Sequence, residues 1–296
     1  MTELNPNQST IDSETQELLE LLRTRTWAFM GTPQIAVDFL ERLHTAYDIR
    51  PNLTVTNPDK KTGRKQTLTP SPIKAFSEQS EITCLTPEKP AEIVDVLLEL
   101  DFVLVFAYHH ILPQEVLDAP KHGILNIHPS LLPSYRGPSP IMSAILADDK
   151  QTGVTIIQLD HLMDHGPIVS QIPYTFFEWQ RNREVEQILS KAGADLFVQT
   201  INGYLDRYII PEEQNHERAS YCKKFTKADM EIDRTAPPYD QYLTYCAFPK
   251  PFFYEGGTRI VVTQAEWLAE FEQFVIKRVI PEGKKEIDFI KLKIDK

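Results

Sequence analysis

The sequence predicts an α/β protein with a mostly parallel sheet flanked by helices, followed by a small β-rich domain. Residues 27–30 and 102–107 are almost continuous apolar runs, which is typical of parallel strands buried on both faces. Segments with helical spacing separate such runs, as in βαβ units. From Tyr221 onward, short apolar runs alternate with Gly, Pro and charged residues, which indicates a second, β-rich domain.

Size and composition exclude several classes of protein. The chain has 296 residues, enough for a large domain and a smaller one. No apolar run approaches the roughly 18 residues that span a bilayer, so we expect no membrane association. The net charge of -11 does not favour nucleic-acid binding, although a local basic patch is compatible with it.

The cysteines and the amino terminus indicate a cytoplasmic protein. Cys84, Cys222 and Cys246 are odd in number, widely spaced and without a Cys-x-x-Cys pair, which argues against a disulfide framework and a zinc site. The amino terminus is polar and acidic, unlike a secretory or transit peptide. Residues 1–26 contain a capping-box pattern before several leucines, so we expect a short amphipathic helix there without catalytic residues.

The first expected strand, residues 27–30, ends at a Gly-Thr-Pro turn and is followed by a helix. This order is typical of a Rossmann-like fold, but no Gly-x-Gly-x-x-Gly is present, so a dinucleotide cofactor is not expected. Residues 57–74 then form a long loop with Pro and Gly and a basic cluster. Long irregular loops are usually functional or disordered. The composition leaves both a solvated surface loop and a functional loop open.

Two histidine patterns resemble metal sites but do not satisfy their requirements. His109 and His110 are adjacent on an extended segment and point apart, without a carboxylate or cysteine at ligand spacing. His161 and His165 have the spacing of a metalloprotease helix, but the Glu after the first histidine is missing and Gly-Pro follows at once. We therefore expect no metal.

Asn126 and His128 are the strongest candidates for chemistry. They fall at the end of an apolar strand that Pro129 terminates, and side chains two residues apart share one face. Open α/β sheets bind ligands at this end of their strands. An amide can donate to an oxyanion and an imidazole can move a proton, but Ser130 lacks the Gly-x-Ser-x-Gly turn of a nucleophile. The pair suits acyl transfer to an amine that the substrate supplies. The alternative is two satisfied polar groups at a strand end.

The surrounding residues resemble a known family. Residues 128–137 read His-Pro-Ser-Leu-Leu-Pro-x-Tyr-Arg-Gly, preceded by Asn-x, and are similar to the motif of the folate-dependent formyltransferases. The resemblance implies that Asn126 and His128 are catalytic and that 10-formyltetrahydrofolate is the formyl donor. It also selects Asp164, in Met-Asp-x-Gly-Pro, as the catalytic carboxylate, which would otherwise read as a turn residue. A carboxylate beside an imidazole fixes its tautomer and makes it a better base.

The resemblance also implies where folate binds. In this family, the segment after the central strand lines the pterin pocket, and backbone groups around Ile111 and Leu112 hold the folate. The residues that follow the catalytic histidine complete the expected set: Tyr108, Ile111, Leu112, Ser130, Leu131, Leu132 and Pro133.

Two regions resemble the tRNA-binding parts of the methionyl-tRNA formyltransferase branch. The loop at 57–74 is similar to a basic loop that contacts the tRNA acceptor end, and Arg64 stands where the branch has an arginine facing the acceptor stem. Binding of tRNA phosphates requires cationic side chains. The candidate contacts are Lys60, Lys61, Arg64 and Lys65.

The carboxyl-terminal part matches this branch more loosely. Residues 221–227 and 281–285 resemble an OB-like domain with a basic, tRNA-facing surface. Phe248-Pro249-Lys250-Pro251 stands where the branch has Asn-Pro-Trp-Pro, and the stretch after Val262 is short for a full barrel. The cations available for such a surface are Lys277, Arg278, Lys284, Lys285, Lys291 and Lys293.

These observations predict an extension at 1–26, a catalytic domain at 27–207, a linker at 208–220 and a reduced OB-like domain at 221–296. The expected reaction transfers a formyl group from 10-formyltetrahydrofolate to methionyl-tRNA, and a monomer is favoured. One alternative is formylation of a nucleotide-linked amino sugar by the same three residues. Net acidity and the reduced second domain favour that alternative, and the basic loop opposes it. A further alternative is an inactive protein that keeps the folate pocket.

Overall fold

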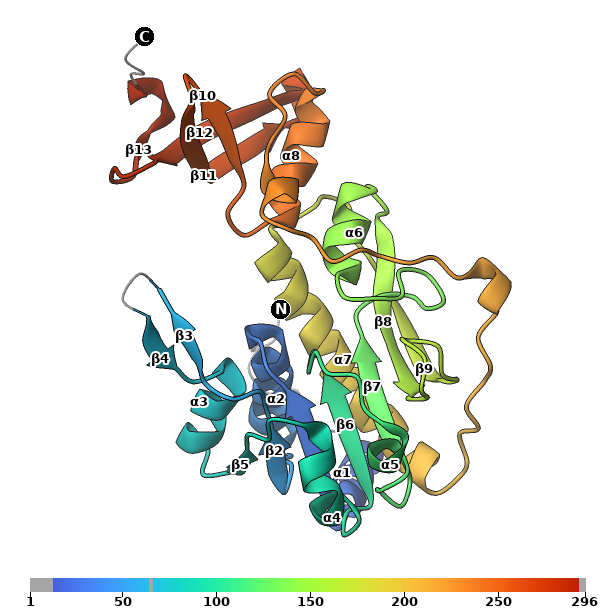
Figure 1. Cartoon of the computed structure of the whole chain (residues 1–296). Helices are drawn as coiled ribbons and strands as arrows, with labels where there is room; N and C mark the ends of the chain where they lie inside the picture. The colour runs from blue at the N-terminus through green and yellow to red at the C-terminus, as the bar shows by residue number, and fades with distance from the viewer. Residues whose placement is uncertain (1–12, 64–65, 293–296) are drawn as a thin grey trace, which may run out of the picture. The chain divides into compact units, whose positions relative to one another are not determined.

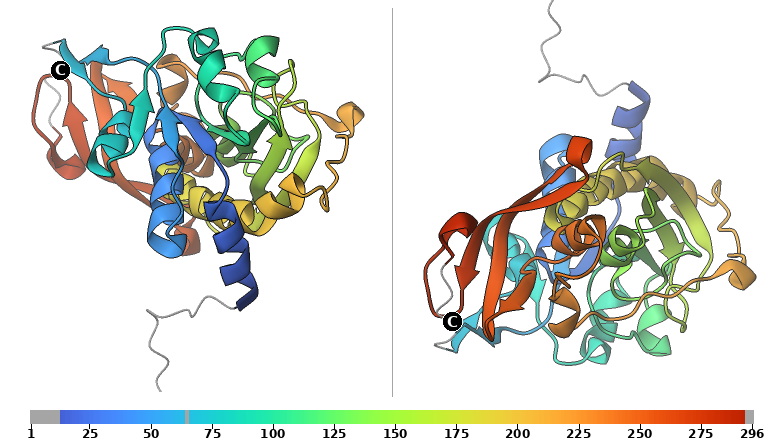
Figure 2. Two further views of the ribbon diagram at one scale, coloured as in Figure 1. Left: turned by 90° about the horizontal axis from the view of Figure 1, so that it is seen from below. Right: turned by 90° about the horizontal axis from the view of Figure 1, so that it is seen from above.

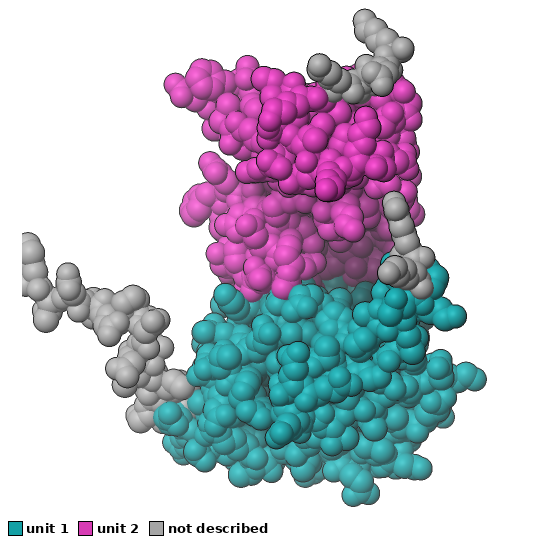
Figure 3. Space-filling view, turned by 90° about the vertical axis from the view of Figure 1, so that its left-hand side faces the viewer, with its two compact units in different colours: residues 1–128, 155–172, 190–214 teal, residues 129–154, 173–189, 215–296 magenta. Residues whose placement is uncertain are grey.

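The computed structural model describes residues 13–63 and 66–292. Residues 1–12, Arg64, Lys65 and Lys293 are outside this part of the chain, so the expectations for them stay predictions. The chain divides into two compact units, coloured separately in Figure 3. The first unit comprises residues 1–128, 155–172 and 190–214, and the second comprises 129–154, 173–189 and 215–296.

A seven-stranded sheet in the order β5-β2-β1-β6-β7-β8-β9 organises the first unit, and its parallel part confirms the predicted Rossmann-like fold (Figure 1). The strands from β5 to β7 are parallel, and β8 is antiparallel to β7. The strand bounds are β1 Trp27–Gly31, β2 Leu53–Val55, β5 Thr83–Leu85, β6 Phe102–Phe106, β7 Ile124–His128, β8 Gln151–Gln158 and β9 Ile168–Thr175.

Helices cover both faces of this sheet, which explains why every residue of β1 and β6 is buried. On one face, Phe39 and Phe197 pack against the aromatic residues of these strands, and α2 and α7 lie side by side (Figure 2). Each such aromatic pair contributes about 0.5–1.5 kcal/mol beyond its buried area. The other face is apolar and packs under η1, α4 and α5. The helices of this unit are α1 Ser13–Arg23, α2 Gln34–Tyr47, α3 Pro72–Gln79, η1 Pro90–Ile93, α4 Val94–Leu97, α5 Gln114–Leu117 and α7 Asn182–Leu205, of which residues 182–189 belong to the second unit.

The basic loop contains a short hairpin that its composition did not indicate. Strands β3 Lys60–Thr62 and β4 Thr67–Thr69 are antiparallel, and the Thr62 and Thr69 hydroxyls are 2.6 Å apart. Gly63 has a φ of 68°, a left-handed conformation that glycine adopts without a steric penalty. All six strand residues are exposed.

The second unit contains the predicted β-rich region as a four-stranded sheet in the order β10-β11-β12-β13. Its three described pairings are antiparallel, and the β11–β12 hairpin is the longest. Tyr242 and Tyr245 of α8 pack against Trp267 and Phe274 of this hairpin. The element bounds are α6 Pro140–Leu146, α8 Pro238–Ala247, β10 Phe252–Glu255, β11 Thr258–Leu268, β12 Gln273–Pro281 and β13 Ile287–Asp288. Among the described residues, no helix combines the length and apolarity needed to cross a membrane.

Candidate active site

Strand β7 carries Asn126 and His128 at its carboxyl end. Asn126 pairs with Ile157 and His128 with Thr155 of β8, so their side chains share one face of the sheet. Pro129 follows directly and has no N–H with which to extend the ladder. The imidazole is buried, with 5% of the side chain exposed, and Asn126 is partly buried. Both groups therefore lie at the sheet edge where α/β proteins bind ligands.

The Asp164 carboxylate faces this imidazole. Asp164 lies in the loop 159–167, between β8 and β9, and its Oδ1 is 3.6 Å from His128 Nδ1. This separation is longer than an ordinary hydrogen bond but short enough for a direct electrostatic interaction. Only 13% of the Asp164 side chain is exposed, so water screens the pair weakly. An amide, an imidazole and a carboxylate thus belong to one compact unit.

The 159–167 loop is held in one conformation by local contacts. Asp164 adopts a left-handed backbone conformation with a φ of 51°, which is uncommon for a residue with a side chain. At Gly166, a Cβ would lie 1.9 Å from the Gln158 carbonyl oxygen, so only glycine fits. His165 Nδ1 donates to Asp160 at 2.6 Å, and the Leu162 N–H donates to the same carboxylate.

Gln214 is a residue that the sequence did not single out. Its side-chain amide is buried and donates to the carbonyl oxygens of Asp164, at 2.9 Å, and Gly166, at 2.8 Å. Two backbone hydrogen bonds between Ile168 and Glu212 align this segment with the loop. One amide therefore fixes the backbone on both sides of His165, next to the candidate carboxylate. A glutamine in a polar stretch gives no signal of this role in the sequence.

The segment at 108–112, predicted to bind the co-substrate, combines buried and exposed side chains. The Tyr108 side chain is 2% exposed and packs in the apolar core, where burial raises its pKa to about 12. Ile111 is 84% exposed, and Leu112 is buried beside it. None of the hydrogen bonds among the described residues uses the backbone of Ile111 or Leu112. The segment therefore presents an exposed apolar side chain beside backbone amide groups that have no partner among the described residues.

The residues after His128 belong to the second unit, where they form a rigid turn. Ser130 is fully buried and donates to the Ser134 carbonyl at 2.6 Å, and Leu132 is also buried. Arg136 is 1% exposed and donates to His216 Nδ1 at 2.8 Å. This contact requires an unprotonated Nδ1. The motif arginine therefore has a structural partner within its own unit, which the motif alone did not reveal.

The candidate tRNA-contacting cations are in different environments. Lys60 and Lys61 are exposed on β3, whereas Arg64 and Lys65 are outside the described residues. In the β-rich sheet and the short 3-10 helix Phe289–Lys291 that follows it, three candidates pair with carboxylates: Lys277 with Glu266 at 2.6 Å, Arg278 with Glu286 at 2.8 Å and Lys291 with Asp288 at 2.7 Å. Lys284 and Lys285 are exposed. The sheet therefore presents less positive charge than its count of basic residues suggests.

Histidines 161 and 165 do not form a metalloprotease helix. Both lie in the 159–167 loop, where His165 pairs with Asp160. Within residues 13–63 and 66–292, no three His, Cys, Asp or Glu side chains are grouped as metal ligands.

Fold and site together define the class: a Rossmann-like α/β protein with a histidine–carboxylate pair at the carboxyl edge of its sheet. The model of the formyl transferase family matches residues 26–201, and the chain belongs to this family. The chain is 40% identical over 213 residues to the methionyl-tRNA formyltransferase of Roseiflexus sp. strain RS-1, covering 71% of this chain and 66% of that protein. It is 37% identical to the enzyme of the same name from Listeria welshimeri, covering 71% and 68%. The match therefore spans about two thirds of these relatives.

Solved structures share the fold at low sequence identity. The methionyl-tRNA formyltransferase from Clostridium thermocellum aligns with a TM-score of 0.60 and 14% identity, covering 89% of this chain and 99% of that one. An N-formyltransferase from Helicobacter canadensis, in complex with folinic acid and dTDP-3-aminofucose, aligns with a TM-score of 0.60 and 18% identity, covering 86% and 95%. At these identities the likeness concerns the fold alone.

Proposed function

We propose that this protein transfers the formyl group of 10-formyltetrahydrofolate to the free amino group of methionyl-tRNA. The observation that carries the proposal is the buried His128 imidazole with the Asp164 carboxylate 3.6 Å away, on the strand that also bears Asn126. The identity of 40% and 37% to proteins named methionyl-tRNA formyltransferase supports this choice of acceptor.

In the proposed reaction, folate supplies a formyl group activated on nitrogen. The Asn126 amide donates a hydrogen bond to the carbonyl oxygen as negative charge develops on it, and protonated His128 stabilises the same charge. Asp164 orients the imidazole through Nδ1 and assists proton movement between the attacking amine and the departing nitrogen. The attacking amine belongs to the acceptor, so the protein needs no nucleophile of its own.

Folate binding is proposed for two segments. The backbone of Ile111 and Leu112 offers hydrogen bonds, and the Ile111 side chain offers an apolar surface. The Tyr108 side chain packs in the core, so in this proposal Tyr108 positions the segment that contains Ile111 and Leu112. The remaining proposed contacts are Ser130, Leu131, Leu132 and Pro133. No metal takes part in the proposed chemistry.

One observation favours a second candidate acceptor, a nucleotide-linked amino sugar. The three ion pairs in the β-rich sheet neutralise cations that tRNA phosphates would need, and the chain carries a net charge of -11. Lys60 and Lys61, together with Arg64 and Lys65, support tRNA instead. As part of the main proposal, the enzyme acts as a monomer in the cytoplasm, where aminoacylated tRNA is available.

A formylation assay that offers methionyl-tRNA and an amino-sugar nucleotide in parallel tests this proposal. With 10-formyltetrahydrofolate as donor, we expect product from methionyl-tRNA. Product from the sugar nucleotide alone would establish the second candidate. No product from either acceptor, in a protein that still binds folate, would support the inactive folate-binding alternative.

A further inference from the structure

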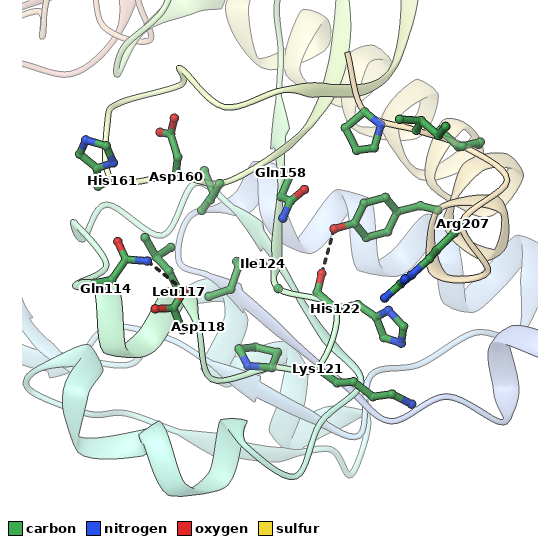
Figure 4. Close-up of a pocket in the computed structure, with 17 residues that line it drawn as sticks. Gln114, Leu117, Asp118, Lys121, His122, Ile124, Gln158, Asp160, His161 and Arg207 are labelled. Atoms are coloured by element: carbon green, nitrogen blue, oxygen red, sulfur yellow. Dashed lines mark hydrogen bonds between the residues drawn. The ribbon is translucent and has the colours of Figure 1, made fainter. Parts of the chain in front are cut away.

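A hollow of about 630 Å³ lies in the first unit, at the opposite end of β7 from the candidate active site. Its walls come from α5, the turn before β7, the end of β8 with the start of the loop that follows it, and the end of α7 with the segment up to Pro211 (Figure 4). Ile124, at the start of β7, lines the hollow, while His128 ends the same strand. At roughly 3.3 Å per residue, the two positions are about 13 Å apart along the strand. The hollow therefore lies at the other end of the strand from His128, although Asp160 and His161 of its wall belong to the loop that carries Asp164.

The acidic groups of the hollow are already engaged. The Asp118 carboxylate accepts a hydrogen bond from Gln114 Nε2 at 2.9 Å. The Asp160 carboxylate accepts from His165 and from the Leu162 N–H. These partners occupy acceptor positions of both carboxylates, which keep their negative charge.

Three polar side chains of the hollow remain available for a ligand. Among the described residues, the side chains of Gln158, His161 and Arg207 have no hydrogen-bond or ion-pair partner. His122 Nε2 is buried and also lacks a partner in the described part of the chain. Burial and the nearby cations lower the pKa of His122, and Lys121 and Arg207 are among those cations. Of these groups, the Arg207 guanidinium and the Gln158 amide can donate hydrogen bonds to an anion.

Arg207 occupies an unusual position for a side chain. It follows the end of α7 with a φ of 64°, in the left-handed conformation that glycine most often provides at this place in a helix. Figure 4 shows its side chain on the same side of the hollow as that of His122, with Asp160 and His161 on the other. The Tyr204 hydroxyl donates to the His122 carbonyl at 2.8 Å, which joins this side to α7.

We propose that this hollow is a binding site for a small organic anion that carries a phosphate or carboxylate group. Arg207 would bind the anionic oxygens, and the Gln158 amide would donate a further hydrogen bond. The apolar part of the ligand would pack on Leu117, Ile124 and Leu159. The volume lies within the roughly 300–1,000 Å³ usual for small-molecule sites. This inference does not depend on the identity of the formyl acceptor.

Calorimetric titration of the full chain tests the proposal, with inorganic phosphate and succinate as separate probes at constant ionic strength. Arg207→Gly is the decisive variant, because it removes the cation where glycine suits the backbone better. Gln158→Leu keeps the approximate size of the side chain but removes the amide donor. Lys89→Ala is the control, since Lys89 is an exposed cation of the same unit away from the hollow.

We expect the wild type to bind at least one of the two probes. Both hollow variants should bind it about tenfold or more weakly, and Lys89→Ala should bind it as the wild type does. The probe that binds identifies the ligand group as phosphate or carboxylate. The unfolding temperature of unliganded Arg207→Gly should equal or exceed that of the wild type, which excludes misfolding as the cause. No binding of either probe in the millimolar range, or equal affinity in Arg207→Gly, would overturn the proposal.

Discussion

The Asn126 amide and the His128 imidazole can act on one carbonyl because strand geometry places them on the same face of β7. This placement follows from the sequence alone, since the apolar neighbours and Pro129 define both the strand and its end. The position of Asp164 does not follow in this way. It is distant in sequence, and its left-handed conformation arises from loop contacts that no periodicity encodes. Resemblance to a family, and not spacing, selected this residue.

We predict that Asn126→Ala lowers the formylation rate by roughly two to three orders of magnitude, because it removes a donor aimed at the developing oxyanion. The matched control is Gln79→Ala, which removes an exposed amide at the end of α3. Single-turnover kinetics with 10-formyltetrahydrofolate measure the effect, and circular dichroism checks the fold. Wild-type turnover in Asn126→Ala would exclude its catalytic role.

His128→Ala is expected to abolish detectable formylation while the fold persists. The imidazole both stabilises charge and moves a proton, so no neighbouring group replaces it. Addition of imidazole to the assay should restore part of the activity if the side chain acts through its ring. Formylation by His128→Ala in the absence of added imidazole would contradict the assignment.

At the scale of secondary-structure elements, the Gln214 amide explains how the β8–β9 connection presents a carboxylate. A single side chain bonds two carbonyl groups, and the segment that carries it pairs with the first residue of β9. The sequence predicted β8, the loop and a polar stretch at 208–220. It did not predict that this stretch contacts the loop, because such contacts depend on tertiary packing between distant segments.

We expect Gln214→Leu to lower kcat more than it raises KM for folate, since it leaves two buried carbonyl groups without a donor and frees the Asp164 backbone. Each unpaired group costs about 1–3 kcal/mol. Steady-state kinetics well below the unfolding temperature separate this effect from general destabilisation. Gln214→Glu keeps the size of the side chain but loses the amide donor, so it should lower kcat in the same way as Gln214→Leu. Unchanged kcat in both variants would show that Gln214 does not position Asp164.

Gly166→Ala should destabilise the protein by several kcal/mol, because the new Cβ meets the Gln158 carbonyl oxygen at 1.9 Å. Gly63→Ala is the matched control. Gly63 has a positive φ, of 68°, which Gly166 does not, and a Cβ at Gly63 would have no neighbour within 4 Å. That substitution should cost only about 1–2 kcal/mol. Chemical denaturation measures both, and equal losses would show that the Gly166 packing is unimportant.

At the scale of the whole molecule, the sequence predicted the Rossmann-like sheet and the β-rich second part correctly, because buried strands and turn residues leave direct patterns. Charge was harder to interpret. Counting basic residues suggested a cationic surface on the β-rich sheet, whereas the structure pairs Lys277, Arg278 and Lys291 with carboxylates. The Lys277–Glu266 pair joins two strands and depends on their register, which a linear sequence does not display, whereas Lys291 and Asp288 are only three residues apart. Acceptor choice therefore depends more on the basic loop than on that sheet.

If tRNA is the acceptor, the KM for it should rise steeply with salt, since phosphate contacts release bound counterions. Lys60→Ala combined with Lys61→Ala should raise this KM and flatten its salt dependence, with kcat nearly unchanged. Lys89→Ala, an exposed lysine elsewhere in the first unit, is the control. A salt-independent KM, or identical curves for all three proteins, would contradict tRNA docking by this loop.

The most direct measurement is transfer of a radiolabelled formyl group from 10-formyltetrahydrofolate to methionyl-tRNA, with wild type and Asn126→Ala assayed in parallel and an amino-sugar nucleotide as the competing acceptor. The proposed function predicts formylmethionyl-tRNA with the wild type, little sugar product and a loss of roughly two to three orders of magnitude in the variant. Exclusive formylation of the sugar, or equal rates for the two proteins, would contradict it.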